Sequence, residues 1–595
     1  MSDPSFTPDT QAEQHTTKVF SIEQTSGEQT TLHPWIQHYE PGVPDHLTLP
    51  DRPLTWLLDF ASHQYANQSA LLYYGTRITY AQLSNQANRF AVGLQRLGIQ
   101  KGDRVAIALP NIPQFPIAFY GALRAGAVVV PTNPLYTEHE LQHQLADSGA
   151  KVIVMLDMYY PRLQAIRKET EVEQVIVTSP ADFLPPFLQR LYPFSQRGNK
   201  PIRSLLTRKS LNEDPGLRLM QSMLRSTSKG GIELFNLPLP AKGNDLAVLQ
   251  YTGGTTGLAK GAMLTHRNLL ANAMQTRSWM PQAHDGAESA LCVTPFFHAY
   301  GLTAAMNVSI LAGATMILLP RFKAKNVLEA VYRYRPSLFP GIPTMYVALM
   351  NEAGKRTDYL KSIKYCISGA SPLPAKVQSD FETITGGKLV EGYGLSEAAP
   401  VTHCNPLTDE SRPGSIGLPL PDVEAAILNQ ETGEPVPVGE AGELVVKGPN
   451  VMQGYWNRPE ETQAIFSHGW LHTGDIARMD EDGYFYIVER IKDMIITGGF
   501  NVYPREVEEV LYNHPAVAEA AVVGLLDDYR GETVSAFIIL KAGFEPIEKT
   551  KNDILAFCRE CLSGYKVPRR IEFRNSLPKS SAGKILRREL RTRPT

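Results

Sequence analysis

The sequence predicts an α/β protein, with a large N-terminal body of parallel-rich sheets and helices and a small α+β domain at its C-terminus. Three observations support this prediction. The chain has 595 residues, too many for one hydrophobic core. Between residues 104 and 320, Val- and Ile-rich runs alternate with helical patterns, which is typical of strand-helix-strand units with buried parallel strands. Near residue 489 this alternation stops.

The elements follow in order along the chain. Residues 1–30 are polar with no apolar core, so we expect a disordered tail and neither a signal peptide nor a presequence. The body covers 31–489, and its expected strands include RVAIAL, AVVVP, AKVIVML, QVIVTS and DLAVLQY, with FPIAFYGALRAG as a helix. Residues 490–595 form the second domain, with the helix PREVEEVLYN, the strands AEAAVVGLL and ETVSAFIIL, another helix and a basic tail.

The composition excludes several classes of protein. With 58 basic and 60 acidic residues, the net charge gives no reason to expect a nucleic-acid partner. Five scattered cysteines do not form a secreted disulfide framework, which favours a cytoplasmic protein. Cys558 and Cys561 lie in a helical pattern without a second ligand pair, so we expect two helix residues and not a zinc site. The longest apolar run is far shorter than the ~20 residues that cross a bilayer.

One segment of the body, 182–231, interrupts the strand-helix alternation. Between Phe183 and Gly230 it carries nine basic and two acidic residues, interleaved with Phe, Leu, Tyr and Met. A basic amphipathic insertion of this kind is able to rest on an anionic membrane surface, at the inner face of the cell membrane. The alternative is a surface insertion whose apolar residues pack on the body, and the sequence does not separate the two.

The stretch YTGGTTGLAKG, from Tyr251 to Gly261, directly follows the expected strand DLAVLQY. Closely set glycines let backbone N–H groups approach phosphate oxygens, and threonine hydroxyls add donors. The order Lys260-Gly261 differs from a Walker A loop, in which Gly-Lys opens the helix. A loop at the carboxyl end of a parallel strand is where such sheets bind ligands, so we favour a phosphate site over a plain turn.

Five further motifs occur in a fixed order: SGASP (368–372), EGYGLSE (391–397), WLHTGD (470–475), ERIKDMIITGGFNVYPRE (489–506) and PKSSAGK (578–584). Together with the Thr/Gly loop they resemble the acyl-adenylate-forming (AMP-binding) enzymes over about residues 50–590, most closely the bacterial long-chain fatty-acid–CoA ligases. The resemblance implies ATP-dependent activation of a long-chain fatty acid through acyl-AMP, with release of pyrophosphate, and then transfer to CoA with release of AMP. It also implies that the C-terminal domain is mobile.

The resemblance assigns roles to residues of these motifs. The expected ATP- and AMP-binding residues are Thr252, Gly253, Gly254, Thr255, Thr256, Gly257, Lys260, Gly369, Ala370, Ser371, Glu391, Gly392, Tyr393, Gly394, Ser396, Asp475 and Arg490. Within this set, the ring of Tyr393 faces adenine, the carboxylate of Asp475 accepts from the ribose hydroxyls, and Arg490 contacts ribose and phosphate. Lys492 is the expected hinge, and Gly498 and Gly499 form a wall of the CoA channel.

Three residues are expected to be catalytic. Lys584 lies in a Ser/Gly loop that a swinging domain brings to the α-phosphate during adenylation. Glu397 offers a hard oxygen ligand for Mg²⁺. His298 in TPFFHAYG is interpreted as a gate or positioning residue, because acyl-AMP is already activated and a thiol needs little base. Tyr300, Leu302 and Met306 follow at near-helical spacing, either as the lining of an acyl tunnel or as ordinary core residues.

Alternatives remain within and outside this family. A related enzyme activates medium-chain or aromatic acids, and another passes the acyl group from acyl-AMP to a carrier protein. The alternative from a different functional class is a catalytically silent binding protein with the same fold. Lys584, Glu397, Asp475 and Arg490 together argue against the silent protein. The expected small molecules are ATP, Mg²⁺, CoA and the acid, and a homodimer is kept as a candidate assembly.

Overall fold

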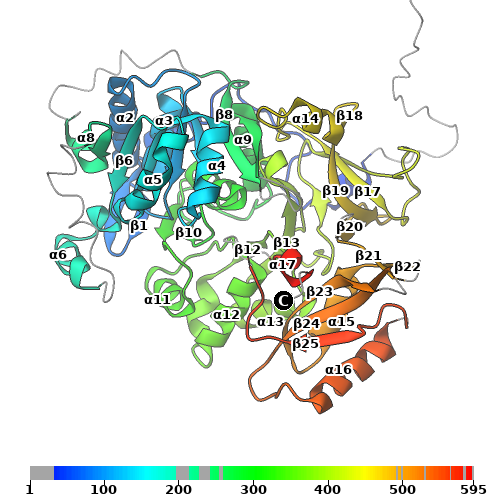
Figure 1. Ribbon diagram of the computed structural model, residues 1–595. Helices are drawn as coiled ribbons and strands as arrows, with labels where there is room; N and C mark the ends of the chain where they lie inside the picture. The colour runs from blue at the N-terminus through cyan, green and yellow to red at the C-terminus, as the bar shows by residue number, and fades with distance from the viewer. Residues whose placement is uncertain are drawn as a thin grey trace, which may run out of the picture.

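The computed structural model describes residues 33–195, 214–226, 241–252, 259–490, 493–497, 500–527, 531–562, 564–579 and 585–591. The expected tail 1–30 lies outside these ranges. Figure 1 shows a large body, coloured blue to yellow, and a smaller C-terminal part in orange and red. The predicted α/β class and the separate C-terminal domain are confirmed.

A seven-stranded sheet in the body contains all the strands predicted from the Val- and Ile-rich runs. Its order is β7-β6-β5-β3-β4-β8-β9, and all neighbours are parallel except β8 and β9. The strands are β3 (Arg104–Ala108), β4 (Val128–Pro131), β5 (Ala150–Leu156), β6 (Gln174–Thr178), β7 (Leu217–Leu219), β8 (Leu246–Thr252) and β9 (Lys260–Thr265). Because both faces of the sheet are covered, its central strands are mostly apolar: β4 is buried throughout, and β5 is buried except at Lys151.

Two four-stranded sheets continue the body. The first has the order β10-β11-β1-β2, with β1 (Ser69–Tyr73), β2 (Thr76–Thr79), β10 (Ser289–Cys292) and β11 (Thr315–Leu318). The second has the order β12-β13-β14-β15, with β12 (Tyr365–Ser368), β13 (Lys388–Gly394), β14 (Val401–Cys404) and β15 (Leu418–Pro419). Leu338 bridges Ala290 and Tyr365 in parallel and so joins the two sheets. The SGASP and EGYGLSE motifs therefore begin on β12 and β13, two neighbouring strands of this joined sheet.

Two five-stranded sheets complete the fold. The body's antiparallel sheet contains β16 (Glu424–Leu428), β17 (Gly442–Lys447), β18 (Phe466–Ser467), β19 (Trp470–Met479) and β20 (Phe485–Arg490). The C-terminal sheet contains β21 (Ile495–Thr497), β22 (Phe500–Val502), β23 (Val517–Asp527), β24 (Gly531–Leu540) and β25 (Arg570–Phe573). The chain passes from one sheet to the other between Arg490 and Ile495. The domain boundary expected at 489/490 stays a prediction.

Helices cover the sheets of both domains. In the body they are α1 (Trp56–Gln64), α2 (Tyr80–Arg96), α3 (Gln114–Arg124), α4 (Glu138–Ser148), α5 (Tyr160–Ile166), α6 (Pro186–Ser195), α8 (Met220–Ser226), α9 (His266–Ser278), the π-helix η7 (Gly301–Asn307), α10 (Val308–Leu311), α11 (Ala324–Tyr334), α12 (Pro343–Ala353), α13 (Ala375–Thr385) and α14 (Pro459–Ile465). The C-terminal domain has α15 (Pro504–Asn513), α16 (Glu548–Cys561) and α17 (Arg587–Arg591). Short 3-10 helices are η1 (Pro34–His38), η2 (Asp157–Tyr159), η3 (Arg167–Glu169), η4 (Pro180–Phe183), η8 (Thr357–Ser362) and η9 (Ser396–Ala398).

Local sequence explains several of these helix starts. Thr79, Thr137 and Thr265 form capping boxes at the starts of α2, α4 and α9, each with a side-chain oxygen of the residue three positions later. Each box satisfies two backbone donors at the helix N-terminus. Cys558 and Cys561 lie in α16 as predicted, the first buried and the second exposed.

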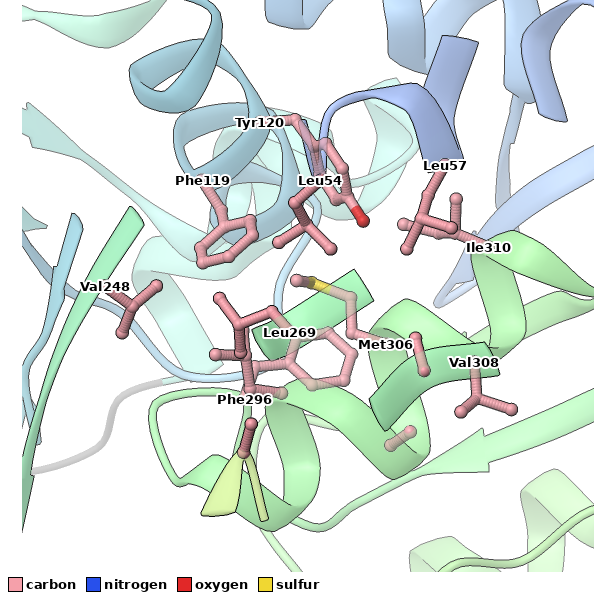
Figure 2. Packing of buried hydrophobic residues seen from close by; sticks show 14 of the residues in the cluster. Leu54, Leu57, Phe119, Tyr120, Val248, Leu269, Phe296, Met306, Val308 and Ile310 are labelled. Carbon is pink, nitrogen blue, oxygen red and sulfur yellow. The ribbon is translucent and has the colours of Figure 1, made fainter. Parts of the chain in front are cut away.

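The largest hydrophobic core lies where the joined sheets meet α1, α3, α9, η7 and α10. Figure 2 shows Met306 of η7 among Leu54, Phe119, Phe296 and Leu269, all of them buried. The C-terminal domain has its own cores, whose buried members all come from residue 495 onward. Each domain therefore buries apolar surface independently.

The insertion 182–231 divides into two parts in the structure. Residues 214–226 belong to the body, because β7 extends the seven-stranded sheet and Met220 and Leu224 of α8 are buried. In contrast, α6 lies at the edge of the body (Figure 1), and Phe187 and Leu191 on it are 71% and 44% exposed. The packed alternative thus describes 214–226, while α6 presents apolar side chains to solvent.

Candidate active site

The Thr/Gly loop connects β8 to β9 in an antiparallel hairpin, in which Thr252 pairs with Lys260. Because β8 is parallel to β4, Thr252 at the end of β8 lies at the carboxyl end of the parallel strands. Thr252 and Lys260 are described. The loop residues Gly253, Gly254, Thr255, Thr256 and Gly257 lie outside the described residues.

Helix α4 contacts both ends of this hairpin. On one side, Tyr251 donates from its hydroxyl to Oδ2 of Asp147 at 2.6 Å. Arg458 donates to Oδ1 of the same carboxylate at 2.8 Å. On the other side, His143 Nε2 lies 3.0 Å from the carbonyl oxygen of Ala259. The ends of the loop are therefore fixed against a helix that the motifs did not indicate.

The SGASP segment, with the expected nucleotide-binding residues Gly369, Ala370 and Ser371, follows β12, which is parallel to β13 and pairs Ser368 with Glu391. Gly369 lies against the ring of Tyr300, where an added Cβ would approach the ring atoms to 3.0 Å. Ala370 has φ of +64°, a left-handed conformation that is uncommon outside glycine. Ser371 is partly exposed beside it. The small residues of SGASP are thus explained by close backbone approach.

The EGYG strand places Tyr393 opposite Asp475 of β19. The Tyr393 hydroxyl donates to Oδ2 of Asp475 at 2.5 Å, and Asp475 is only 3% exposed. In the antiparallel pairing of β19 and β20, Arg490 is the backbone partner of Asp475. Gly394 is required for this turn, because an added Cβ would overlap the carbonyl oxygen of Pro400. Three expected nucleotide residues from distant motifs are therefore neighbours.

A buried histidine lies behind this pair. His403 of β14 is the register partner of Tyr393, and its ring is 5.9 Å from the Tyr393 ring in an edge-on contact. Burial lowers the pKa of His403 to about 3, so the ring is neutral. His403 therefore supports the aromatic side chain without adding charge near Asp475.

Glu391 contacts the C-terminal domain. Arg505 of α15 lies 3.3 Å from its Oε1, and the two side chains are 8% and 6% exposed. Oε2 of Glu391 also accepts from the backbone N–H of Leu373 at 2.9 Å. Burial raises the pKa of Glu391, and Arg505 opposes that rise. This carboxylate joins the SGASP segment to the second domain.

Glu397 lies in η9 together with Ser396, beside the hairpin. Its Oε1 accepts from the hydroxyl of Tyr455 at 2.7 Å. Within the described ranges, no group of three or more His, Cys, Asp or Glu side chains is arranged to hold a metal ion. Mg²⁺ usually takes one or two carboxylates and completes its shell with phosphates and water, so one glutamate beside a phosphate loop fits that ion.

His298 follows β10 in a loop tied to β8. Gln250 of β8, 3% exposed, donates from its side-chain amide to the carbonyl oxygen of Phe297 at 3.2 Å. The backbone N–H of Tyr300 donates to His298 Nδ1 at 3.3 Å. His298 thus lies next to the strand that leads into the Thr/Gly loop.

The three residues suggested for an acyl tunnel are all buried. Tyr300 donates from its hydroxyl to the carbonyl oxygen of Ile367 at 2.5 Å, and Leu302 and Met306 are fully enclosed in the main core. A cavity of about 20 Å³ lies beside η7. Its lining consists of Thr276, Met280, Ala290, Ala304, Val308, Leu338, Pro340, Tyr365 and Ile367. Ala304 and Val308, and not Leu302 or Met306, supply the lining from this helical segment.

Four expected residues, Lys492, Gly498, Gly499 and Lys584, lie outside the described residues. Several residues that contact the site had no role assigned from the motifs. Asp147, Gln250, Tyr455 and Glu461 lie outside the motifs, and Glu461 Oε2 is 2.7 Å from Lys260 Nζ. Arg505 lies within the motif 489–506 but had no assigned role. The stretch GYWNRPE (454–460), a Gly-aromatic turn leading to a Pro-initiated helix, was the available signal for Tyr455.

Comparison with known proteins defines the class. A family model described as AMP-binding enzyme matches residues 58–456, and a model described as AMP-binding enzyme C-terminal domain matches residues 506–584. The chain belongs to the family of AMP-binding enzymes.

Two individual relatives are similar to this chain over most of its length. The chain is 47% identical to a long-chain-fatty-acid–CoA ligase of Bacillus subtilis (strain 168), over 94% of this chain and 97% of that protein. It is 37% identical to a feruloyl-CoA synthase of Amycolatopsis sp, over 88% and 96%.

Solved structures agree with the fold. ATP-bound MatB from Rhodopseudomonas palustris matches with a TM-score of 0.77 and 30% identity, over 91% of this chain and 98% of that one. The anthranilate CoA ligase AuaEII in complex with anthranoyl-AMP matches with a TM-score of 0.79 and 28% identity, over 91% and 97%.

Proposed function

We propose that this protein is an AMP-forming acid–thiol ligase that converts long-chain fatty acids to acyl-CoA through acyl-AMP, using ATP and CoA. The observation that carries the proposal is the meeting of three motifs around one site. Thr252 and Lys260 of the hairpin, Glu397 of η9, Tyr393 of β13 and Asp475 of β19 come from sequence separations of more than 200 residues. The 47% identity to the long-chain-fatty-acid–CoA ligase of Bacillus subtilis supports a long-chain fatty acid as the substrate.

The site residues divide the chemistry as follows. Asp475 accepts from the ribose hydroxyls, and Tyr393 lies against adenine. Lys260 and the Thr/Gly loop bind the phosphates, and Glu397 holds Mg²⁺, which neutralises phosphate charge when bound. Lys584 approaches the α-phosphate during adenylation and withdraws when the C-terminal domain turns about Lys492.

We propose that the acyl chain enters the cavity beside η7. At about 20 Å³ the cavity has room for roughly one water molecule, so a long chain requires neighbouring side chains to move. From η7 the lining contains the small residue Ala304, and flexible Met280 lies in the same lining. CoA arrives from the side of Gly498 and Gly499, with His298 as a gate near the reacting carbonyl.

We also propose that α6 gives the protein affinity for an anionic bilayer surface. None of the helices in the described part of the chain has the length and apolar character needed to cross a bilayer. On α6, exposed Phe187, Leu188 and Leu191 accompany exposed Arg190, the composition of an interfacial helix. Phe187→Ser with Leu191→Ser should reduce co-sedimentation with anionic vesicles, and Leu526→Ser, at an 87% exposed position of β23, is the control. Equal binding by both proteins would contradict the proposal.

A homodimer is a further proposal, and light scattering at two protein concentrations tests it.

The central test is ATP–pyrophosphate exchange with palmitate, decanoate or ferulate as the acid, followed by CoA-dependent thioester formation. Palmitate should give the highest kcat/KM in both assays. A preference for ferulate would favour the aromatic-acid ligase. Exchange without thioester formation would favour an acyl-AMP ligase, and no exchange with any acid would contradict the enzyme itself.

A further inference from the structure

We propose that Tyr455 is a positioning residue of the phosphate site, whose hydroxyl orients Glu397 and whose ring supports Lys260. This inference rests on the proposed roles of Glu397 and Lys260 and adds a residue that none of the motifs includes. Tyr455 lies just before α14, in the segment that follows the antiparallel sheet strand β17. It touches one expected phosphate ligand and one expected metal ligand at the same time.

The hydroxyl side of Tyr455 fixes the orientation of the carboxylate. It donates to Oε1 of Glu397 at 2.7 Å, the ordinary length of a strong O–H···O bond. A phenol hydroxyl is a hydrogen-bond donor at neutral pH, and an ionised carboxylate only accepts. With Oε1 bound in this way, rotation of the carboxylate is restricted and Oε2 takes a defined direction.

The ring side of Tyr455 contacts the lysine that follows the Thr/Gly loop. Lys260 Nζ lies 5.3 Å from the ring centroid, within the range of cation–π attraction. The same ammonium lies 2.7 Å from Oε2 of Glu461. Both partners of that ion pair are more than one third exposed, so solvent screens their attraction and the pair is weak. A phosphate is able to replace Glu461 as the partner of Lys260 while the ring contact is kept.

Backbone hydrogen bonds fix Tyr455 relative to both neighbours. Trp456 donates from its N–H to the carbonyl of Gly261 at 2.8 Å, and Met263 donates to the carbonyl of Gly454 at 2.9 Å. These bonds add the segment to the free edge of β9. Met452 donates to the carbonyl of Glu397 at 2.8 Å. Tyr455 is thus held by the two elements whose side chains it contacts, as expected of a residue that sets geometry.

The first variant tests the hydrogen bond that orients Glu397 without changing the charge of Glu397. Tyr455→Phe keeps the ring over Lys260 and removes the bond to Glu397. Loss of a partner that orients a metal ligand typically costs 10–100-fold in metal affinity. We expect the Mg²⁺ concentration for half-maximal adenylation to rise by about 10-fold, with most of the rate restored at saturating Mg²⁺. Mn²⁺ binding to the enzyme–ATP complex, followed by electron paramagnetic resonance, should weaken by a similar factor and does not depend on turnover.

Two further variants make the result specific. Tyr160 on α5 forms a matched phenol–carboxylate bond of 2.7 Å to Asp214, and Tyr160→Phe, which removes it, should leave Mn²⁺ binding unchanged. Tyr455→Leu also removes the ring, and it should raise the KM for ATP beyond that of Tyr455→Phe. Thermal unfolding of each variant, measured beside the parent protein, checks that the fold is kept.

Comparison with Glu397→Gln distinguishes this inference from the function on which it rests. If Glu397→Gln shifts the metal titration and Tyr455→Phe does not, the positioning role is wrong and the metal role stands. If Glu397→Gln leaves the titration unchanged, the proposed metal role is wrong. Support requires that both single variants shift it and that the double variant is no worse than Glu397→Gln alone.

Discussion

Replacing Arg505 by Met should destabilise the protein strongly near neutral pH and much less in mild acid. Arg505 and Glu391 form an ion pair between the domains, with 8% and 6% of their side chains exposed. Removing one partner of a buried pair typically costs about 3–5 kcal/mol, because the other charge stays buried. The contacts here are 3.3–3.4 Å long, which places the expected loss near ~3 kcal/mol.

The dependence on pH follows from the direction of the pKa shift. Burial already raises the pKa of Glu391, and loss of Arg505 raises it further. A carboxyl whose pKa is higher in the folded state contributes stability below its unfolded pKa of about 4.3 and loses it as pH rises through the folded value. The Arg505→Met penalty is therefore complete above the variant's folded pKa. As the pH falls toward the unfolded value, Glu391 becomes protonated and the penalty decreases.

Urea unfolding at about pH 8 and about pH 5 measures this difference. Glu391→Gln combined with Arg505→Met should be more stable than Arg505→Met alone at the higher pH, since the buried charge is gone. Lys376→Met is the control, because its pair with Asp380 is about half exposed and should contribute less than ~1 kcal/mol. A penalty of equal size at both pH values would refute the reasoning, as would a double variant no more stable than Arg505→Met.

Three further predictions concern the ligase reaction. Lys584→Ala should slow acyl-AMP formation by roughly 10²–10³-fold and leave thioester formation from supplied acyl-AMP nearly intact, whereas equal losses in the two single-turnover assays would exclude a swinging lysine. Tyr393→Phe removes the 2.5 Å bond to Asp475 and should change the KM for ATP by less than about 10-fold, because the ring remains; a collapse of kcat would give the hydroxyl a larger role. Ala304→Phe should lower kcat/KM for palmitate more than for decanoate if the cavity holds the chain, and Met306→Ala should instead lower the free energy of unfolding by about 2–5 kcal/mol.

Much of the fold was predictable because the pattern is local. The runs RVAIAL, AVVVP, AKVIVML, QVIVTS and DLAVLQY became β3, β4, β5, β6 and β8, since strands covered on both faces are apolar throughout. PREVEEVLYN became α15 for the same kind of reason, an apolar face at helical spacing. The prediction was incomplete for 182–231, where a charge count did not reveal that β7 completes an edge of the sheet.

The site was predictable only where motifs carry it. Small residues such as Gly369 and Gly394 could be recognised because the backbone approaches other atoms closely there. The contacts of Asp147 and Arg505 could not be predicted, because they join residues more than 100 positions apart in the sequence. The expected acyl tunnel was difficult to predict for a different reason. Near-helical spacing identifies one face of η7, but whether that face meets the core or a cavity depends on the elements packed around it.

The separate cores of the C-terminal domain bear on where related chains could recombine. Every buried member of those clusters lies at or beyond Ile495, and the last strand of the body ends at Arg490. A crossover between these two positions, joining one relative's body to another's second domain, would separate no described core residue from its neighbours. Whether the two joined domains fit each other would then depend on the contact between Glu391 and Arg505. Recombinant chains that keep both residues of this charge pair should therefore fold more often than chains that keep only one of them.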